Sequence, residues 1–581
     1  MFGWCGKILH IDLTNHAVET EIPSRLVLER WIGGKGLAGL YLRPHIQRSY
    51  DDPQMPLIVM TGPLVNTPAP TSGRACIASR SPLTGTVGDC SAGGSLGTQM
   101  KKAGWDGIVI TGKAVETCGV IIHNDTCRIV SATEFKHLPT DMVTEQLRQS
   151  GSVMCIGPAA EHGVKFSNIA IDGHYFAGRN GLGLVMAAKN LKYLTIRGDG
   201  KTSVADSREL TLAREDIFRL IASSPILFGE LGLKNYGTGA LYDLMDSRHM
   251  MPTANFRKTH FEAAKAMNAY AFANRYGITS SGCRGCHIQC KKRTKDGRSI
   301  PEFETMSHFS ALLENDDIES VLEANRLCNQ LGIDTISAAA TVACYSEITG
   351  RRITGAGLLE LLEQIGRGEG EGALLKDGSA AYAAGVGEPE ASMSVKSQEL
   401  SAYDPRGAYG MALAYATSTR GGCHLRAYPI VHEILRKPVA TDRFSFSGKA
   451  RIVKIAEDIN AVVDSLTACK FVFLSASLEE YARAYTAVTG VATSAQELLA
   501  CGERIYYHDR IMNALNGFDS TSDDLPMRFF TDGGTDGPGF QVPPLSRKDF
   551  LETRSKYYRI RGLDEKGRPT AETAKKLGLE W

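Results

Sequence analysis

Short apolar runs dominate the first third of this 581-residue chain. Residues 7–13, 56–60, 107–111 and 119–123 are rich in valine, isoleucine and leucine, and glycine, aspartate or proline bounds each run. This pattern predicts β-strands. The connections between the runs are irregular and often glycine-rich. We therefore expect a β-rich first domain with a few helices, and the pattern does not match a regular βαβ repeat.

The rest of the chain shows helical spacing. Apolar residues recur every three or four positions over 209–223 and 318–330, and Gly332 supplies a stop signal after the second of these helices. Two further helices are expected over 335–348 and 407–419. From about residue 200 onward, the pattern thus predicts a mainly helical protein.

Two changes in composition divide the chain. The residues near 198–207 and near 387–398 are interpreted as linkers. The fold class expected is α+β, with a β-rich N-terminal domain at 1–205, a helical domain at 206–395 that carries a cysteine cluster, and a helical C-terminal domain at 396–581.

Charge and cysteine content narrow the class of protein. The net charge of +1 gives no electrostatic footprint for nucleic acid or for an anionic membrane. No apolar run is long enough to span a bilayer, and the N-terminus lacks the apolar core of a signal peptide. The 14 cysteines are mostly dispersed and do not suggest a disulfide framework. We expect a soluble, cytoplasmic protein in a reducing compartment.

The cysteine cluster is Cys283, Cys286 and Cys290, with the spacing C-x2-C-x3-C. Thiolates this close can converge on one point, and they are strong ligands for soft metals. The spacing favours three corners of an iron–sulfur cubane whose fourth cysteine comes from elsewhere. A zinc site, with or without His287, and accidental clustering are the alternatives. Spacing cannot choose the fourth ligand among Cys328, Cys344, Cys423, Cys469 and Cys501.

Glycine-rich stretches offer candidate anion sites. Residues 70–74, 80–86 and 88–94 combine arginines, hydroxyl groups and backbone N–H groups, as phosphate binding requires. Residues 177–183 (AGRNGLG) precede an expected helix at 184–190, whose N-terminus would attract an anion. Ordinary turn chemistry is the alternative for both regions.

Residues 34–39 match the dinucleotide-binding pattern G-x-G-x-x-G formally. A dinucleotide fold needs a buried strand directly before this pattern, whereas residues 27–31 are charged and look helical. We therefore expect a loop between two elements at 34–39.

Several polar residues are ambiguous when each is considered alone. Glu302 and Glu304 flank Phe303 just after the cysteine cluster. A buried carboxylate here would have a raised pKa and would suit acid–base chemistry, but a solvated turn is the simpler interpretation. Asp334 is best interpreted as a helix N-cap. His424 follows a glycine break beside cysteine and arginine, which does not decide between a structural and a chemical role.

Several stretches, taken together and in order, resemble the tungsten-containing aldehyde:ferredoxin oxidoreductase family over nearly the whole chain. They are residues 6–9 (GKIL), 33–37 (GGKGL), 61–64 (TGPL), 81–85 (SPLTG), 177–183 with 189–192 (KNLK), 252–256 (PTANF), the cysteine cluster, 557–562 (YYRIRG) and 577–579 (LGL).

The resemblance implies that the β-rich first domain is a platform for a tungsten bis-pterin cofactor of the molybdopterin type, with two helical domains closing over it. In this family four dithiolene sulfurs hold the metal, so no protein side chain need ligate it. Magnesium commonly lies between the pterin phosphates. Positions that match the family's phosphate anchors are Arg74, Arg179, Asn180, Gly181 and Gly183.

The resemblance also implies a [4Fe–4S] cluster near one pterin, held by Cys283, Cys286, Cys290 and Cys469. The positions that match pterin contacts are Asp334, Arg426 and Asp464, so a dual role is expected for Asp334.

Two stretches depart from the family pattern. Residues 88–94 read GDCSAGG where the family often has G-D-S-N-S-G-G, so Ser91 replaces an asparagine that helps to hold magnesium. Residues 464–469 read DSLTAC where the family has D-x-x-G-L-C. We therefore expect a changed magnesium contact at Ser91 and changed pterin contacts in the second stretch.

The activity implied is oxidation of an aldehyde by water to a carboxylic acid. Glu304 would take a proton from water or from the hydrated aldehyde, and His424 would hydrogen-bond the developing oxyanion or an oxygen on the metal. Electrons would leave through the cluster to ferredoxin or a ferredoxin-like subunit, and a homodimer would be unsurprising. The alternatives are a subunit of a related tungsten reductase complex that acts on aromatic thioesters and a zinc-stabilised binding or scaffold protein.

Overall fold

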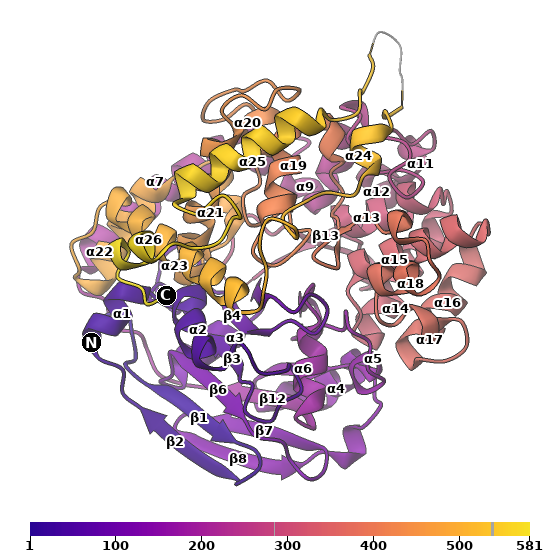
Figure 1. The fold of residues 1–581 in the computed structure, drawn as a ribbon. Coiled ribbons are helices and arrows are strands. Elements are labelled where there is room, and N and C mark those ends of the chain that lie inside the picture. Colours follow the sequence, from indigo (N-terminus) through magenta and orange to yellow (C-terminus); the bar gives the residue numbers. More distant parts are fainter. Residues whose placement is uncertain (284, 536–539) are drawn as a thin grey trace.

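The computed structural model describes residues 1–283, 285–535 and 540–581 (Figure 1). Its N-terminal third contains two six-stranded sheets. The first sheet has the strand order β2-β1-β6-β3-β4-β5, in which β1 and β6 are parallel and the other neighbours are antiparallel. Its strands are β1 (Ile8–Asp12), β2 (Ala17–Glu21), β3 (Leu57–Met60), β4 (Ala75–Arg80), β5 (Val87–Ala92) and β6 (Gly107–Thr111).

The second sheet has the order β11-β10-β9-β12-β7-β8, with β7 and β12 parallel. The four predicted strands are confirmed as β1, β3, β6 and β7, with ends that differ by one residue at most. The strands of the second sheet are β7 (Cys118–His123), β8 (Thr126–Ser131), β9 (Ser152–Ile156), β10 (Ile169–Ile171), β11 (Tyr175–Ala177) and β12 (Leu191–Arg197).

Alternate residues of the first sheet face two different cores, because successive side chains of a strand point to opposite sides. Leu9 and Ile11 of β1 share an apolar cluster with Ile122 and Leu194 of the second sheet. Ile8 packs instead in a cluster that contains residues of the C-terminal helices. The first sheet therefore lies between the second sheet and the helical part of the molecule (Figure 1).

The remaining two thirds are mainly helical, which confirms the predicted fold class. The predicted helices at 209–223, 318–330, 335–348 and 407–419 are α7, α14, α15 and α19. The main helices are α7 (Ser207–Ser223), α13 (Phe303–Phe309), α14 (Ile318–Leu331), α15 (Thr335–Thr349), α16 (Gly355–Arg367), α19 (Tyr409–Thr417), α21 (Lys449–Leu466), α22 (Leu478–Thr489), α23 (Ala495–Leu515) and α25 (Arg547–Arg561).

The prediction of a loop at 34–39 is wrong, because these residues belong to helix α2 (Gly34–Leu42). Glycine is a poor helix former, but here close packing requires it. A Cβ atom on Gly34 would lie 2.3 Å from the carbonyl oxygen of Asp464, and one on Gly36 would lie 2.2 Å from that of Trp31. Gly34 thus allows α2 to pack directly against the end of α21, and Gly36 allows it to pack against the end of α1 (Arg25–Trp31).

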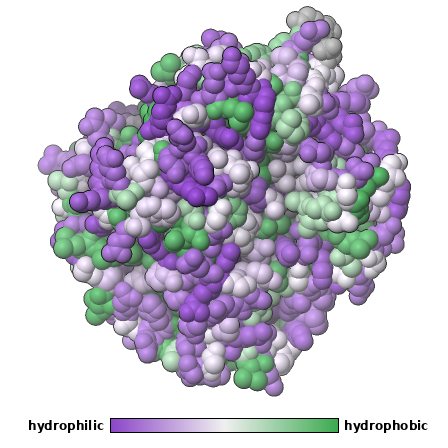
Figure 2. Space-filling view, viewed as in Figure 1, coloured by the Kyte–Doolittle hydropathy of each residue, from purple (hydrophilic) through white to green (hydrophobic). Residues whose placement is uncertain are grey.

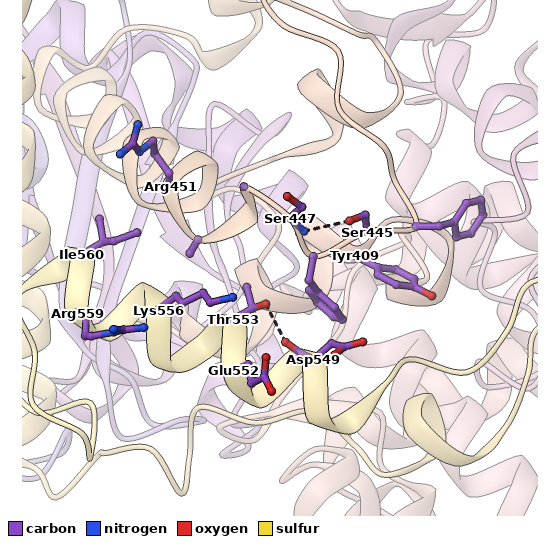
Figure 3. A pocket seen from close by; sticks show the side chains of 14 residues that line it. Tyr409, Ser445, Ser447, Arg451, Asp549, Glu552, Thr553, Lys556, Arg559 and Ile560 are labelled. Atoms are coloured by element: carbon purple, nitrogen blue, oxygen red, sulfur yellow. Dashed lines mark hydrogen bonds between the residues drawn. The ribbon is translucent and has the colours of Figure 1, made fainter.

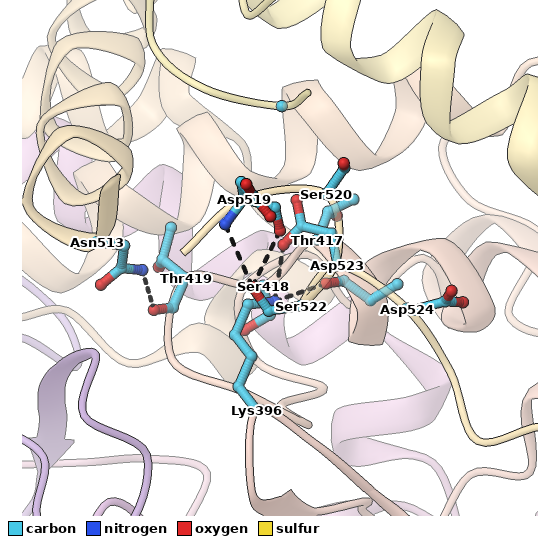
Figure 4. Close-up of polar contacts among 12 residues, drawn as sticks. Lys396, Thr417, Ser418, Thr419, Asn513, Asp519, Ser520, Ser522, Asp523 and Asp524 are labelled. Atoms are coloured by element: carbon cyan, nitrogen blue, oxygen red, sulfur yellow. Dashed lines mark hydrogen bonds and ion pairs between the residues drawn. The ribbon is translucent and has the colours of Figure 1, made fainter. Parts of the chain in front are cut away.

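The expected linker near 387–398 includes the short strands β15 (Ser394–Val395) and β16 (Gln398–Glu399), which form a hairpin. Lys396 at its tip is buried and contacts Asp523 at 2.8 Å and the carbonyl oxygen of Ala416 at 2.7 Å (Figure 4). Asn513 donates to the carbonyl oxygen of Thr419 at 2.6 Å. These contacts fix the segment that follows α19, which carries His424.

Hydrophilic side chains predominate on the face of the molecule shown in Figure 2, and hydrophobic ones are scattered over it. Among the described helices, none combines the length and the apolar character that a bilayer crossing requires.

Candidate active site

A cavity of about 500 Å³ contains most of the site residues expected from the sequence. Its lining comes from the loop before β4, from β5, from the segment around β11 and from helices α13 to α15, together with residues of the last third. The expected site residues that line it are Arg74, Ser91, Arg179, Cys283, Cys286, Cys290, Glu304, Asp334, His424 and Cys469. Asn180, Gly181, Gly183, Arg426 and Asp464 are not part of the lining, but hydrogen bonds, ion pairs or chain continuity connect them to it.

A second, more open groove of about 840 Å³ lies between α25 and the segment before α21 (Figure 3). Tyr409, Arg451 and Glu552 are among its lining residues. It contains none of the residues expected to act on a substrate or to hold a cofactor, so the first cavity is the candidate site.

The four expected cluster ligands line the same cavity. Cys283, Cys286 and Cys290 lie between strands β13 (Ile278–Ser281) and β14 (Lys291–Thr294). Cys469 arrives after the end of α21, and its backbone N–H donates to the carbonyl oxygen of Thr71 at 2.9 Å. Of the five candidates for the fourth position, the structure places Cys469 on the cavity lining. Arg284 lies outside the described residues.

Burial raises the pKa of the Cys469 thiol to about 11, and the nearby thiols of Cys286 and Cys283 also raise it while Arg74 lowers it. Burial likewise raises the pKa of Cys290. Within the described residues, no three histidine, cysteine, aspartate or glutamate side chains are arranged around a single metal ion. The four thiols line a common space instead, and bringing buried thiolates together there would need a compensating cation.

Arg74 lies beside this group of thiols and is held in place by Ser91. Its Nε donates to the Ser91 hydroxyl at 2.9 Å, and its Nη2 donates to the Ser91 carbonyl oxygen at 2.5 Å. Burial opposes its charge, but the thiols of Cys469 and Cys283 raise the pKa of the guanidinium. Arg74 is therefore a half-buried cation that lines the cavity beside the thiols.

The expected phosphate loop and the start of α15 are joined through Asp334. Its carboxylate accepts from the backbone N–H of Ser337 at 2.8 Å, which confirms the N-cap, and from the backbone N–H of Arg179 at 2.9 Å. The Arg179 side chain donates to Ser401 at 3.1 Å and to the carbonyl oxygen of Glu399. The backbone of 179–181 is left-handed, and it leads into α6 (Leu182–Ala188), two residues earlier than expected.

A chain of buried ion pairs lies behind the cavity. Arg426 contacts Asp89 at 3.0 Å and Asp464 at 3.6 Å, and Lys470 contacts Asp464 at 2.7 Å. Lys35 of α2 contacts Asp89 at 3.1 Å and Asp509 of α23 at 2.6 Å, so the chain of ion pairs extends to α23. The sequence analysis did not identify Lys35, because residues 34–39 were interpreted as a loop. The signal that could have indicated it is a lysine between two glycines, a pattern that allows close packing around a buried charge.

Glu304 lies in the first turn of α13 and its side chain is only 17% exposed, so the simpler interpretation of a solvated turn is wrong for this residue. Its Oε2 accepts from the backbone N–H of Ala402 at 2.7 Å, and its Oε1 lies 3.3 Å from Nε2 of His424. Burial raises the pKa of Glu304 to about 8. Glu302 differs, since it is exposed enough to pair with Lys291 at 3.0 Å.

His424 is buried, and burial lowers its pKa well below the usual value, with Arg179 and Arg420 adding to the effect. Its Nδ1 lies 2.7 Å from the hydroxyl of Ser401, which also accepts from Arg179. This arrangement favours a Ser401 hydroxyl that donates to Nδ1, which leaves the imidazole proton on Nε2. The neutral imidazole then presents an N–H donor beside Glu304.

Several buried polar atoms around the cavity have no hydrogen-bond partner among the described residues. They are Oε1 of Glu304, Nε of Arg179, Nε of Arg426, Oδ1 of Asp464 and Oδ1 of Asn168. Buried polar groups are almost always paired in folded proteins. Donors and acceptors of this kind, together with four thiols and the Arg74 guanidinium, fit a bulky polar cofactor and an adjacent iron–sulfur cluster.

Comparison with known proteins agrees with this site. Residues 8–198 match the model for the N-terminal domain of aldehyde ferredoxin oxidoreductase, and residues 213–579 match the model for its domains 2 and 3. The chain is 34% identical to the tungsten-containing aldehyde ferredoxin oxidoreductases of Pyrococcus abyssi and Thermococcus kodakarensis, with 99–100% of each chain covered.

More distant similarity extends to other members of the same fold. The chain is 27% identical to the WOR-like subunit of an aliphatic sulfonate oxidoreductase of Pyrococcus furiosus, covering 100% of this chain and 97% of that one. The active-site complex BamBC of benzoyl coenzyme A reductase has the same fold, with a TM-score of 0.84 at 20% identity over 100% of this chain and 97% of that chain. From the two family models and the full-length relatives, the chain belongs to the aldehyde ferredoxin oxidoreductase family, a family of oxidoreductases.

Proposed function

We propose that this protein oxidises an aldehyde to a carboxylic acid at a tungsten bis-pterin centre, with water supplying the oxygen atom and with release of two protons and two electrons. The electrons would pass through a [4Fe–4S] cluster to ferredoxin or a ferredoxin-like subunit. The observation that carries the proposal is the pair of Glu304 and His424, whose largely buried side chains lie 3.3 Å apart in a cavity that four thiols also line. Full-length relatives named for this activity and tungsten support it.

When bound, the tungsten bis-pterin group would supply a Lewis acid and a two-electron acceptor. The residues proposed to hold it are Arg74, Arg179 and Asp334, which line the cavity, and Arg426 and Asp464, which lie behind the lining and each keep a buried polar atom without a partner. The left-handed turn at Asn180 and Gly181, followed by Gly183 at the start of α6, is proposed to anchor a phosphate.

Glu304 is proposed as the general base. Its free Oε1 would accept a proton from water or from the hydrated aldehyde, while the hydrogen bond from Ala402 holds the carboxyl group in place. A pKa raised to about 8 makes its carboxylate a stronger base than an exposed glutamate. His424 would donate its Nε2 proton to the developing oxyanion, with its ring oriented by Ser401.

Cys283, Cys286, Cys290 and Cys469 are proposed to bind the [4Fe–4S] cluster, and Arg74 would offset its negative charge. Magnesium between the pterin phosphates is also proposed. Since the Ser91 hydroxyl accepts from Arg74, its role toward magnesium would be to fix that arginine.

The three domains 1–205, 206–395 and 396–581 remain our proposed division. The packing of Ile217 of α7 in the same cluster as Tyr481 of α22 shows that the start of the second segment contacts the third. All 14 cysteines are free thiols, which supports a reducing, cytoplasmic location.

The related reductase of aromatic thioesters is supported only by shared fold at 20% identity, whereas the relatives named as aldehyde oxidoreductases are 34% identical. The zinc-stabilised scaffold is not supported, because the chain belongs to an oxidoreductase family.

The test is Glu304→Gln in anaerobically purified protein. We expect kcat with a viologen acceptor to fall by about 10²- to 10⁴-fold, the usual contribution of a positioned general base. Iron and tungsten content should stay unchanged. Glu302→Gln, two residues away and paired with Lys291, is the matched control and should keep most of its activity. A fully loaded Glu304→Gln enzyme with near wild-type turnover would show that Glu304 is not the base.

A further inference from the structure

Beside Glu304 and His424, the cavity has a wall of aromatic rings. The ring of Tyr403 lies 5.4 Å from that of Phe303, 5.4 Å from that of His424 and 5.6 Å from that of Tyr428. All four residues line the cavity. Their tilted and edge-on contacts are those that aromatic groups prefer, so an aromatic ring added to this wall would find similar contacts.

The wall is continuous with the apolar part of the lining. Leu241, Ile336, Leu425 and Val431 line the same cavity. Tyr428 and Val431 are only partly buried, so this part of the lining is near the surface. An entering molecule would therefore meet apolar side chains and rings around Glu304, and these favour an apolar substituent on the aldehyde.

The hydroxyl groups of Tyr403 and Tyr428 contact each other at 3.0 Å, and neither makes another hydrogen bond with the described residues. Burial raises the pKa of both phenols, so both stay neutral. Two phenols contain two protons, and one hydrogen bond between them uses only one. The wall therefore combines ring surfaces with one O–H donor.

The cations nearest His424 are already engaged within the protein. Arg179 donates to Ser401 and to a carbonyl oxygen, Arg420 donates to Cys423 at 3.0 Å, and Lys470 contacts Asp464 at 2.7 Å. A charged substituent on the substrate would lose its hydration on entering and would compete for these partners. The site therefore favours an uncharged substrate.

We propose that the preferred substrates are uncharged aldehydes that carry an aromatic ring, and that Tyr403 and Tyr428 are specificity-determining residues. This inference rests on the proposed aldehyde oxidation at Glu304 and His424. The rings of the two tyrosines supply the main contact with the substrate ring, and their hydroxyl groups have a smaller effect.

The first test compares kcat/KM of the metal-loaded wild-type enzyme for benzaldehyde, propanal and 4-formylbenzoate with a viologen acceptor. We expect benzaldehyde to exceed each of the others by about tenfold or more, in line with the discrimination that an apolar pocket achieves. If kcat/KM for propanal or for 4-formylbenzoate equals that for benzaldehyde, the inference is overturned, while the proposed function still stands. A loaded enzyme inactive toward all aldehydes would overturn the proposed function itself.

The second test uses variants. Tyr428→Leu should lower kcat/KM for benzaldehyde by about tenfold and keep kcat/KM for propanal within about threefold of the wild-type value. The propanal value serves as an internal check of folding and metal loading. Tyr428→Phe and Tyr403→Phe keep the rings and should retain the preference for benzaldehyde. Tyr50→Leu changes an equally half-buried tyrosine outside the cavity and should behave like wild type. An unchanged benzaldehyde-to-propanal ratio in a loaded Tyr428→Leu enzyme would exclude Tyr428 as a specificity residue.

Discussion

At the scale of single residues, two glutamates two positions apart have opposite environments. The Glu302 side chain is 43% exposed and pairs with Lys291, whereas that of Glu304 is 17% exposed, accepts one backbone N–H and keeps one buried oxygen without a partner. Water stabilises a carboxylate far better than a protein interior does, so burial favours the protonated form of Glu304. The same residue type thus serves as an ion-pair partner at the N-cap of α13 and as a candidate base two residues later in its first turn.

This difference predicts the pH dependence of the reaction. Glu304 must be ionised to accept a proton, and its pKa is raised to about 8. We expect kcat/KM to rise with pH through about 8 and to fall by about tenfold for each pH unit well below that value. The measurement is kcat/KM for one aldehyde at constant metal content, between about pH 6 and about pH 9.5, a range that includes both sides of the expected inflection.

A profile that is flat between pH 6 and pH 9 would contradict the assignment, as would an inflection near the ordinary glutamate value of about 4.3. Because His424 is held neutral by burial, it should add no inflection of its own in this range.

At the scale of elements, local patterns predicted most of the secondary structure. Two kinds of local pattern were easy to interpret. The strands at 56–60 and 107–111 are apolar runs that are buried almost throughout, and the helix at 318–330 has apolar residues along one buried face. Helix α2 was missed because glycine lowers helix propensity, and the compensating contacts with Asp464 and Ser465 come from more than 400 residues away. No local pattern contains that information.

The N-terminus of α6 gives a prediction at this scale. Gly181 has φ +71° and caps α6, and a Cβ atom there would lie 1.8 Å from the carbonyl oxygen of Lys165. Gly181→Ala must therefore move the loop as well as strain the backbone, and we expect a loss of stability above about 3 kcal/mol together with reduced cofactor loading. Thermal unfolding and tungsten content are the measurements.

Gly350→Ala is the matched control. Gly350 has φ +67° after α15, and nothing lies within 4 Å of its would-be Cβ atom. The Gly350→Ala variant should therefore lose only about 1 kcal/mol of unfolding free energy, through backbone strain alone. Equal losses in the two variants would mean that the contact with Lys165 does not constrain the loop.

At the scale of the whole molecule, the candidate site draws on segments from residue 74 to residue 469. Resemblance to a family predicted the positions that would contact cofactor and substrate, and the fold brings most of these positions to one cavity. The partners that shape their chemistry were not evident from the sequence. Ser401 and Ala402 contact His424 and Glu304 from a different segment, and neither residue has a distinctive local pattern.

The proposed fourth cluster ligand is the clearest case, because spacing left five candidates, the family resemblance implied Cys469, and in the folded chain Cys469 lies near Cys283 and Cys286. We expect Cys469→Ser to lower iron from about four to about three or fewer atoms per chain and to change the electron paramagnetic resonance spectrum of the reduced protein. Cys501→Ser, which changes a half-buried thiol 3.6 Å from Arg504, should keep its iron and its spectrum. Full iron and an unchanged spectrum in Cys469→Ser would mean that the fourth ligand is another residue, whereas loss of iron in both variants would point to general destabilisation of the fold.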